Sequence, residues 1–360
     1  MLRMIVIADD ITGAAEIAGI AYEAGRKTTV IATDTRSMTA AEAVAETRRV
    51  AELHKKTRSF RVVFKKTDSA LRGHVVAELT ALMEVMGYQR AVYLPANPSK
   101  GRIIRNGTYY ILKELVGESQ LMAVPIHETD FRFDPEFPAR TSVMKERFPD
   151  AEAHNILMPD AETMDDIRSI VAQYNDGQTL FAGAADLFTA LLEREGSPNP
   201  KSFITSHSSF LIDNTLILRG STQSKTLDLG IPVAPMPREV YDGSDDLTLW
   251  DTTAYTEKHS LVLSIPYTHR TGKEVAVHLR SMMSEMTRRL VSEHCPEHLI
   301  IEGGATAWAT LRTLGWTRFR IVRQIAPGVV QMSATNGTLV TLKPGSYPWG
   351  SLFEGCQIVQ

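Results

Sequence analysis

The feature that most constrains the fold is an alternation of short apolar runs with longer amphipathic segments in the first hundred residues. Residues 4–8 have the composition of a buried strand, and 12–24 follow with apolar side chains on one helical face before a glycine that suits a helix end. The order then repeats, with strands expected at 28–32, 61–64 and 90–94 and helices at 40–56 and 75–86. Because successive parallel strands need a crossover connection, this order predicts a parallel sheet flanked by helices.

A second α/β pattern begins near Leu211, after a glycine- and proline-rich stretch at 196–200. Its expected strands are 216–218, 260–265, 298–301, 319–325 and 338–342, and its expected helices are 273–294 and 305–314. The segment 101–148 is expected to form loops and short hairpins, and 241–259 to loop outward. The sequence therefore predicts an α/β protein of two domains, 1–210 and 211–360, each a mainly parallel sheet flanked by helices.

Composition excludes several classes of protein. The chain has 360 residues, 43% of them hydrophobic, and a formal net charge of −3, so it lacks the basic excess of a nucleic-acid-binding protein. Cys295 and Cys356 are too few for a disulfide framework or a four-cysteine zinc site. No apolar run approaches the ~20 residues of a membrane span, and the first residues do not resemble a signal peptide. We expect a cytoplasmic enzyme with small-molecule partners and no nucleic-acid or membrane partner.

Polar side chains gather where the first strand of the predicted sheet ends. Asp9 and Asp10 leave the strand 4–8, and Thr12 follows as a helix begins. Asp10 alone would be read as a helix N-cap. An N-cap uses one carboxylate, however, and two stand here. Because ligands of open α/β sheets bind at the carboxyl ends of the strands, the pair also suits a binding site.

Two further clusters follow later strands of the same sheet. The run 65–73 contains Lys65, Lys66, Asp68, Ser69 and Arg72, and the loop 95–102 contains Asn97 and Arg102. A solvated charged turn would explain either cluster alone. Together they suit an anionic, hydroxylated ligand, because arginine binds carboxylates through paired hydrogen bonds, lysine adds a point charge, and aspartate and serine bind hydroxyls.

The second half carries glycine at the ends of its expected strands. The residues concerned are Gly220, Ser221 and Ser224, then Gly303, Gly304 and Thr306, then Gly328, and finally Lys343, Gly345 and Ser346. A glycine pair that opens a helix presents free amides and a favourable dipole to phosphate, although it can also be a plain tight turn. The fingerprints G-x-x-x-x-G-K-[ST] and G-x-G-x-x-G do not occur, and neither do H-E-x-x-H and G-x-S-x-G.

At these residues the sequence resembles the four-carbon acid sugar kinase family, long carried as a domain of unknown function. The resemblance is nearly continuous from Ile5 to about Ser142 and patchier beyond Gly220. It implies an N-terminal sugar-acid domain, a C-terminal nucleotide domain and an active site in the cleft between them. It further implies ATP with Mg²⁺, and phosphorylation of a terminal hydroxyl of an erythronate-, threonate- or oxo-tetronate-like acid. The chain departs from the family at Ala305, where members usually carry Asp or Glu, and at 345–350.

The roles that follow are expectations. Asp10 or Asp68 would orient the acceptor hydroxyl and accept its proton, and Arg72 would serve with them in catalysis. Arg72, Lys66 and Arg102 would bind the substrate carboxylate and the developing phosphoryl charge. The acid would also contact Asp9, Thr12, Ser69 and Asn97, and Asp9 could instead act as the proton acceptor or hold Mg²⁺ through water. The glycine-rich residues of the second half would bind ATP, with Lys343 on its phosphates.

Two other classes of function remain open. A non-catalytic sugar-acid sensor would keep the first site and lose ATP turnover, which Ala305 makes credible. A dehydrogenase on a similar sheet is weaker, because no dinucleotide fingerprint occurs. The acid, its stereochemistry, the phosphorylated carbon, the identity of the base and a homo-oligomeric state also stay open.

Overall fold

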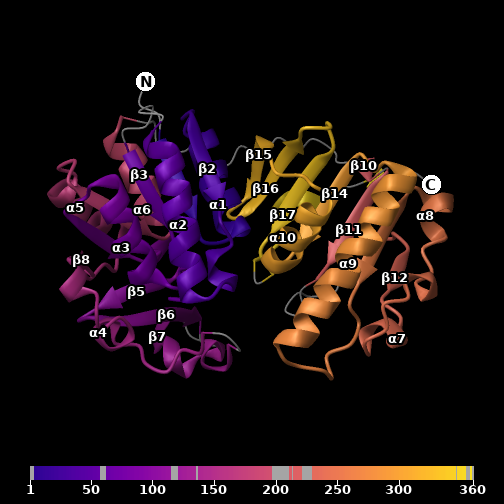
Figure 1. Cartoon of the computed structure of the whole chain (residues 1–360), viewed down its shortest axis with the longest axis horizontal. Helices are drawn as coiled ribbons and strands as arrows, with labels where there is room; N and C mark the ends of the chain where they lie inside the picture. Colours follow the sequence, from indigo (N-terminus) through magenta and orange to yellow (C-terminus); the bar gives the residue numbers. More distant parts are fainter. Residues whose placement is uncertain are drawn as a thin grey trace. The chain divides into compact units, whose positions relative to one another are not determined.

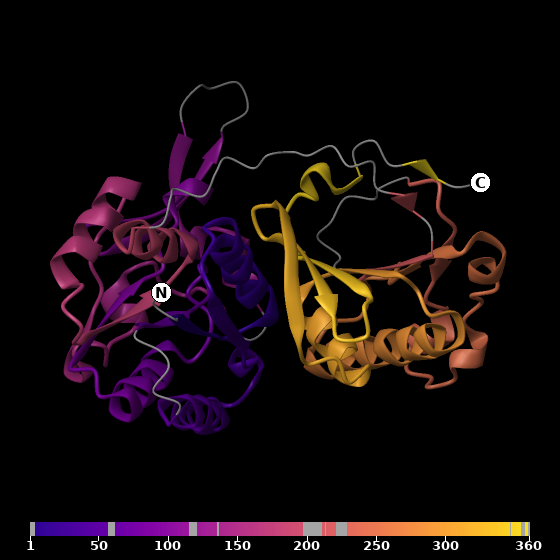
Figure 2. The same ribbon diagram turned by 90° about the horizontal axis from the view of Figure 1, so that it is seen from above.

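The structure, a computed structural model, describes residues 4–56, 62–114, 121–134, 137–196, 211–212, 214–220, 229–345, 347–353 and 357–358. The chain divides into two compact units, Met1–Pro200 and Lys201–Gln360 (Figures 1 and 2). The expected boundary at 210 lies outside the described residues. In these described ranges, no helix is both long and apolar enough to cross a membrane.

The first unit is built on a parallel sheet of six strands. Their order is β2-β1-β3-β9-β4-β8, and every neighbouring pair is parallel. The strands are β1 (Met4–Ala8), β2 (Thr28–Ala32), β3 (Val62–Lys66), β4 (Arg90–Leu94), β8 (Ile156–Leu157) and β9 (Thr179–Gly183). The expected parallel sheet is confirmed: β1 and β4 are almost entirely buried within it, and the edge strand β2 is partly buried.

Helices cover this sheet in two layers (Figure 1). Helix α2 (Ala40–Lys55) packs beside α3 (Val75–Met86), while α1 (Ile11–Glu23) and α5 (Met164–Tyr174) each pack beside α6 (Ala185–Arg194). Left-handed backbone at Gly87 (φ 83°) ends α3, as the sequence predicts. The segment expected as loops and hairpins forms an antiparallel sheet of β5 (Arg102–Arg105), β6 (Thr108–Glu114) and β7 (Leu121–Pro125), followed by the short α4 (Met144–Arg147).

The second unit has a sheet ordered β12-β13-β11-β14-β17-β16-β15. Its strands are β11 (Thr215–Arg219), β12 (Val233–Pro235), β13 (Ser260–Ser264), β14 (His298–Glu302), β15 (Phe319–Ala326), β16 (Val329–Ala334) and β17 (Leu339–Lys343). The first five strands in this order, β12, β13, β11, β14 and β17, are parallel, and β16 is antiparallel to both of its neighbours, β17 and β15. A two-stranded pair joins β10 (Leu211–Ile212) to β18 (Gln357–Ile358).

The expected strands of this unit form, and two strands of its seven-stranded sheet, β12 and β16, were missed. Strand β16 lies between the two expected last strands, because a turn at Gly328 (φ 78°) reverses the chain into it. Helix α9 (Lys273–His294) has the predicted bounds, and α10 (Gly304–Thr313) follows β14. The stretch 241–259, expected as a loop, contains the short helix α8 (Ala254–Lys258) and follows α7 (Arg238–Tyr241).

Candidate active site

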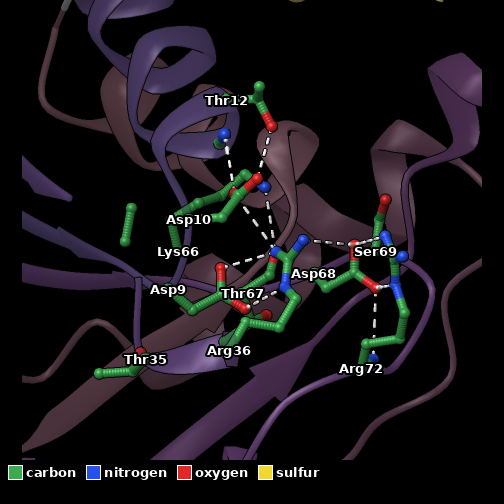
Figure 3. A network of polar contacts seen from close by, with 12 residues as sticks. Asp9, Asp10, Thr12, Thr35, Arg36, Lys66, Thr67, Asp68, Ser69 and Arg72 are labelled. Carbon is green, nitrogen blue, oxygen red and sulfur yellow. Dashed lines mark hydrogen bonds and ion pairs between the residues drawn. The ribbon is translucent and has the colours of Figure 1, made fainter. Parts of the chain in front are cut away.

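Three neighbouring strands bring their following residues to one edge of the first sheet. Strand β1 lies between β2 and β3, with Ala8 paired to both Ala32 and Lys66. The residues after these strands therefore meet at the carboxyl edge. Asp9 and Asp10 follow β1, Arg36 lies on η1 (Thr35–Ser37) after β2, and Asp68 follows β3. Figure 3 shows the three carboxylates turned toward the guanidinium group of Arg36.

Arg36 is the centre of this cluster, and the sequence reasoning missed it. Its Nη2 lies 2.9 Å from Asp9 Oδ1 and 3.2 Å from Asp10 Oδ1, and its Nη1 lies 3.7 Å from Asp68 Oδ1. A second hydrogen bond, from Nε to Asp9 Oδ2, measures 3.1 Å. The signal was present, because strand 28–32 was predicted and a polar residue shortly after it belongs at the same edge.

Burial and ion pairing act in opposite directions on these carboxyl groups. Burial raises the pKa of Asp9 above its usual value, although the charge of Arg36 acts against this. Burial also acts to raise the pKa of Asp10, but the charges of Arg36 and Lys66 outweigh it and the pKa falls. For Asp68, burial is outweighed by the charges of Arg72 and Arg36, which hold its pKa well below the usual range. Asp10 and Asp68 are therefore ionised at neutral pH.

Asp10 has the N-cap role that the sequence left open, and it also lies in the cluster. Its Oδ1 accepts a 2.9 Å hydrogen bond from the amide of Gly13, so it caps α1, and its Oδ2 accepts a 2.5 Å bond from the hydroxyl of Thr12. The same carboxylate stands in the cluster beside Arg36. The N-cap thus fixes the direction in which Asp10 faces the edge, because both of its oxygens are held.

Asp68 is bound by Arg72 in a two-point pair. Arg72 donates from Nε to Oδ2 at 2.7 Å and from Nη2 to Oδ1 at 3.1 Å, and its Nη1 lies 3.3 Å from Asp134 Oδ2. The turn that returns Arg72 onto Asp68 passes through Leu71, a buried residue in the left-handed region at φ 64°. Such strained backbone gathers at functional sites, where the surrounding structure holds it in place.

Arg102 has a different kind of partner. Its Nη1 donates to the hydroxyl of Ser69, and its guanidinium group lies 5.9 Å from the centre of the Phe131 ring, on the short helix η4 (Asp130–Phe133). Arg72 lies 5.8 Å from the same ring. The hydroxyl of Thr67, the residue before Asp68, is buried with no hydrogen-bond partner among the described residues. A ligand oxygen could satisfy it.

Lys66 and Asn97, expected to contact the substrate, are both bound to other groups of the protein. Lys66 Nζ donates to Thr67 O at 3.0 Å and lies 3.5 Å from Glu16 Oε2, a carboxylate that also pairs with Lys100. Asn97 is buried, and its Oδ1 accepts from the amide of Asp186 at 3.0 Å. Asn97 therefore fastens its loop to the start of α6.

Lys65 and Glu78 form a buried ion pair behind the cluster. The two atoms, Lys65 Nζ and Glu78 Oε2, are 2.6 Å apart, and the hydroxyl of Thr35 donates to the same oxygen at 2.7 Å. Thr35 directly precedes Arg36, so this pair supports the turn that carries it. Lys65 is therefore part of a buried ion pair, whereas the solvated charged turn that the sequence left open would have exposed it.

The glycine-rich residues of the second unit also meet at one sheet edge. Arg219, Glu302 and Lys343 end β11, β14 and β17 in register. Val330 pairs with Leu342, which places Gly328 at the same end, and Gly303 and Gly304 open α10 there. A Cβ on Gly220 would lie 2.0 Å from Thr306 Oγ1, so only glycine fits. Ser221, Ser224 and Ser346 lie outside the described residues.

The ammonium group of Lys343 is bound by other groups of the protein at this edge. Its Nζ lies 2.6 Å from Oε1 of the fully buried Glu302, donates to Gly345 O at 3.1 Å, and stands 4.8 Å from the centre of the Trp349 ring. Arg219 lies 3.7 Å from the other oxygen of Glu302. Sequence reasoning assigned no role to Glu302 or Arg219, although each directly follows an expected strand and precedes a glycine that it did single out.

Two family models match the chain. A sugar-binding N-terminal domain matches residues 4–150, and a nucleotide-binding C-terminal domain matches 241–347. The 3-oxo-tetronate kinase of Salmonella typhimurium is 24% identical over an alignment that covers 99% of each chain. The D-threonate kinase of the same organism is 30% identical over 161 residues, 40% of this chain and 36% of that one.

A crystal structure of a Salmonella typhimurium protein, provisionally described as a tRNA synthase, has a TM-score of 0.71 at 19% identity and covers 98% of both chains. At that identity the similarity shows the shared fold alone. The two domain matches together span more than half of the chain. The sugar-binding model matches the first half and the nucleotide-binding model the second, which is the order that the resemblance implies. The chain belongs to the four-carbon acid sugar kinase family.

Proposed function

We propose that this protein is an ATP-dependent kinase that phosphorylates a hydroxyl group of a four-carbon sugar acid bound at the Asp9–Arg36–Asp68 edge of the first unit. The observation that carries the proposal is the arrangement of that edge, where three carboxylates suited to hydroxyls surround Arg36, and Arg102 donates to Ser69, the residue after Asp68. The kinase names of relatives aligned over nearly the whole chain support it.

Asp10 is the preferred acceptor of the substrate's proton. Its side chain is 15% exposed, against 9% for Asp68 and 3% for Asp9. Both oxygens of Asp68 are bound by the cation of Arg72, whereas Asp10 Oδ2 accepts only from the neutral hydroxyl of Thr12. In the reaction, the acceptor oxygen bonds to the γ-phosphorus, the bond from that phosphorus to ADP breaks, and the hydroxyl proton passes to Asp10. Because positioning dominates phosphoryl transfer, a carboxylate of low pKa can serve.

Arg102 is the preferred anchor for the carboxylate of the acid. Arg36 and Arg72 both pair with aspartates, whereas Arg102 donates to the neutral hydroxyl of Ser69. A carboxylate that replaces this hydroxyl would gain a charge-assisted hydrogen bond without breaking an ion pair. The acid would then lie with its carboxylate toward Arg102 and a hydroxyl toward Asp10. We keep Arg72, Thr12 and Ser69 as its further contacts.

The phosphates of ATP would bind at the glycine-rich edge of the second unit. The N-terminus of α10 presents amides of Gly304 and its neighbours, and the helix dipole favours an anion there. Because Lys343 pairs with a buried carboxylate, we assign it to holding the loop at Gly345 and not to contacting phosphate directly. Arg219 is the cation next along this edge, and we propose it for that contact.

Mg²⁺ does not fit among the aspartates of the first unit as they are arranged. Carboxylates are the ligands that Mg²⁺ prefers, at distances near 2.0–2.1 Å in an octahedral shell. Here the space between the carboxylates contains Arg36, which pairs with Asp9 and Asp10 and lies 3.7 Å from Asp68. In the proposed reaction, the groups at this edge therefore act without a bound metal ion.

The test is release of ADP from ATP with D-threonate, D-erythronate and 3-oxo-tetronate as acceptors. Arg102→Ala should weaken acid binding by about 1.5–3 kcal/mol, the usual value of a charged hydrogen bond, and leave ATP affinity unchanged. Arg49→Ala is the matched control, because Arg49 pairs on the surface of α2 with Glu46. Acid binding without ADP release would favour a non-catalytic sugar-acid sensor. The exposed Ala305 at the start of α10, where family members usually carry an acidic residue, is consistent with that alternative. Thermal stabilisation by NAD in place of ATP would favour a dehydrogenase.

A further inference from the structure

Arg36 occupies a position that a divalent cation takes in other carboxylate sites. One guanidinium group lies within 3.2 Å of two carboxylates and 3.7 Å from a third, and these belong to Asp9, Asp10 and Asp68. They leave the ends of two neighbouring strands and converge from different directions, as Figure 3 shows. A planar group with five donors can serve several carboxylates at once, which a single ammonium group cannot do as well.

The backbone holds Arg36 in this position. Its amide donates to Asp9 O at 3.3 Å, and the hydroxyl of Thr33 donates to Ala8 O at 2.8 Å. The next hydroxyl, of Thr35, reaches the buried Glu78 at 2.7 Å. Only 16% of the Arg36 side chain is exposed. A turn held by several hydrogen bonds and a largely covered side chain indicate a permanent part of the site, because a ligand-dependent arm would lack such supports.

We propose that Arg36 is the built-in cation of the acceptor site, so that the sugar acid binds to the first unit without a divalent metal ion. The metal-free binding of the sugar acid rests on the proposed function, whereas the role of Arg36 as the cation among the carboxylates does not. Arg36 neutralises part of the charge of three carboxylates and fixes their directions, and it acts on the substrate through them. It is therefore a positioning residue.

The first experiment needs no variant. D-threonate and D-erythronate are titrated into the full-length protein by calorimetry, without nucleotide, once in EDTA and once in excess Mg²⁺. We expect dissociation constants that agree within about twofold, a negligible free-energy difference. Binding that requires Mg²⁺ would overturn the proposal. Absence of binding under both conditions would contradict the proposed function, and the second experiment would still decide the role of Arg36.

The second experiment uses Mn²⁺ as a paramagnetic probe, with free Mn²⁺ followed by electron paramagnetic resonance. Removal of the guanidinium group leaves three carboxylates facing one another, so Arg36→Ala should gain one Mn²⁺ site with a dissociation constant of about 10⁻⁴–10⁻³ M. The parent protein and Arg49→Ala should lack this site. The double variant Arg36→Ala/Asp9→Asn should lose it, which assigns the site to the cluster.

Two outcomes would refute the role of Arg36. The first is a parent protein that already binds Mn²⁺ in a manner that Asp9→Asn abolishes, since the cation and Arg36 would then coexist. The second is a folded Arg36→Ala, checked by circular dichroism and thermal unfolding, that gains no Mn²⁺ site. Arg36→Lys keeps the charge and provides the conservative rescue, so it should gain no Mn²⁺ site and should bind acid better than Arg36→Ala. Equal acid binding by the two variants would also contradict the proposal.

Discussion

Gly13→Ala should slow phosphoryl transfer while the fold persists. Gly13 is the residue of α1 whose amide donates to Asp10 Oδ1 at 2.9 Å. A Cβ added there would lie 2.6 Å from that oxygen and 3.2 Å from Lys66 Nζ. An ordinary contact begins at 3.4 Å, so Oδ1 would have to move by about 0.8 Å. The same oxygen lies 3.2 Å from Arg36 Nη2, and the shift would disturb that ion pair too.

The size of the effect follows from this displacement. A misplacement near 1 Å at a reacting group can lower a rate by about 10²-fold, so we expect kcat to fall by about 10- to 100-fold. Stability should change little, because alanine favours a helix over glycine by about 1 kcal/mol and this offsets part of the strain. ATP binds in the second unit by our proposal, so its affinity should not change.

A coupled ADP assay with the preferred four-carbon acid measures the rate, and thermal unfolding measures the stability. Asp10→Asn is the companion variant, since it keeps the size of the side chain and removes its charge. It should lower the rate by about 10²–10⁴-fold, the usual contribution of a general base. If Gly13→Ala turned over like the parent at an unchanged unfolding temperature, Asp10 Oδ1 would not be near the reacting hydroxyl, and our assignment of the base would be wrong.

Glu78→Ala should lower the free energy of unfolding by about 3–5 kcal/mol in urea titrations, because Lys65, 1% exposed, would be left as an unpaired buried charge; a loss below that of Glu78→Gln would contradict this. The pKa of Asp68 is lowered in the folded protein because the charges of Arg72 and Arg36 outweigh burial, so its ionised form stabilises the fold above the unfolded pKa of 3.8. Stability from this group is lost as the pH falls below that value, and Asp68→Asn should flatten the acid limb of a stability–pH curve; an unchanged limb would show that the ion pair is not responsible. Ala305→Asp places a carboxylate in the exposed first turn of α10 and should tighten Mg·ATP binding or speed transfer, as calorimetry and the ADP assay would show. Absence of nucleotide binding in both proteins would leave the sugar-acid sensor standing.

Much of the fold could be predicted because hydrophobic periodicity reports local structure directly. The strand Met4–Ala8 is apolar throughout and is buried on both faces, as a central parallel strand must be. Helix α9 was predicted with its bounds because it is long and amphipathic. Strand β16 was missed because its turn at Gly328 also suits a binding loop, and the sequence offers no means to tell the two apart.

The sequence by itself determined which polar residues leave the ends of strands, and hence that Asp9, Asp10 and Asp68 would share one edge. That inference is local, because a parallel sheet puts all its carboxyl ends on one side. Which groups pair within the edge was decided only by tertiary structure. Arg36 belongs to a turn that is held by hydrogen bonds to Asp9, directly after β1, and to Glu78, and these bonds set the direction of its side chain. Lys343 is turned inward by the buried carboxylate of Glu302, which lies 41 residues away in the sequence. Such partners are distant in sequence, and only packing brings them within reach of one another.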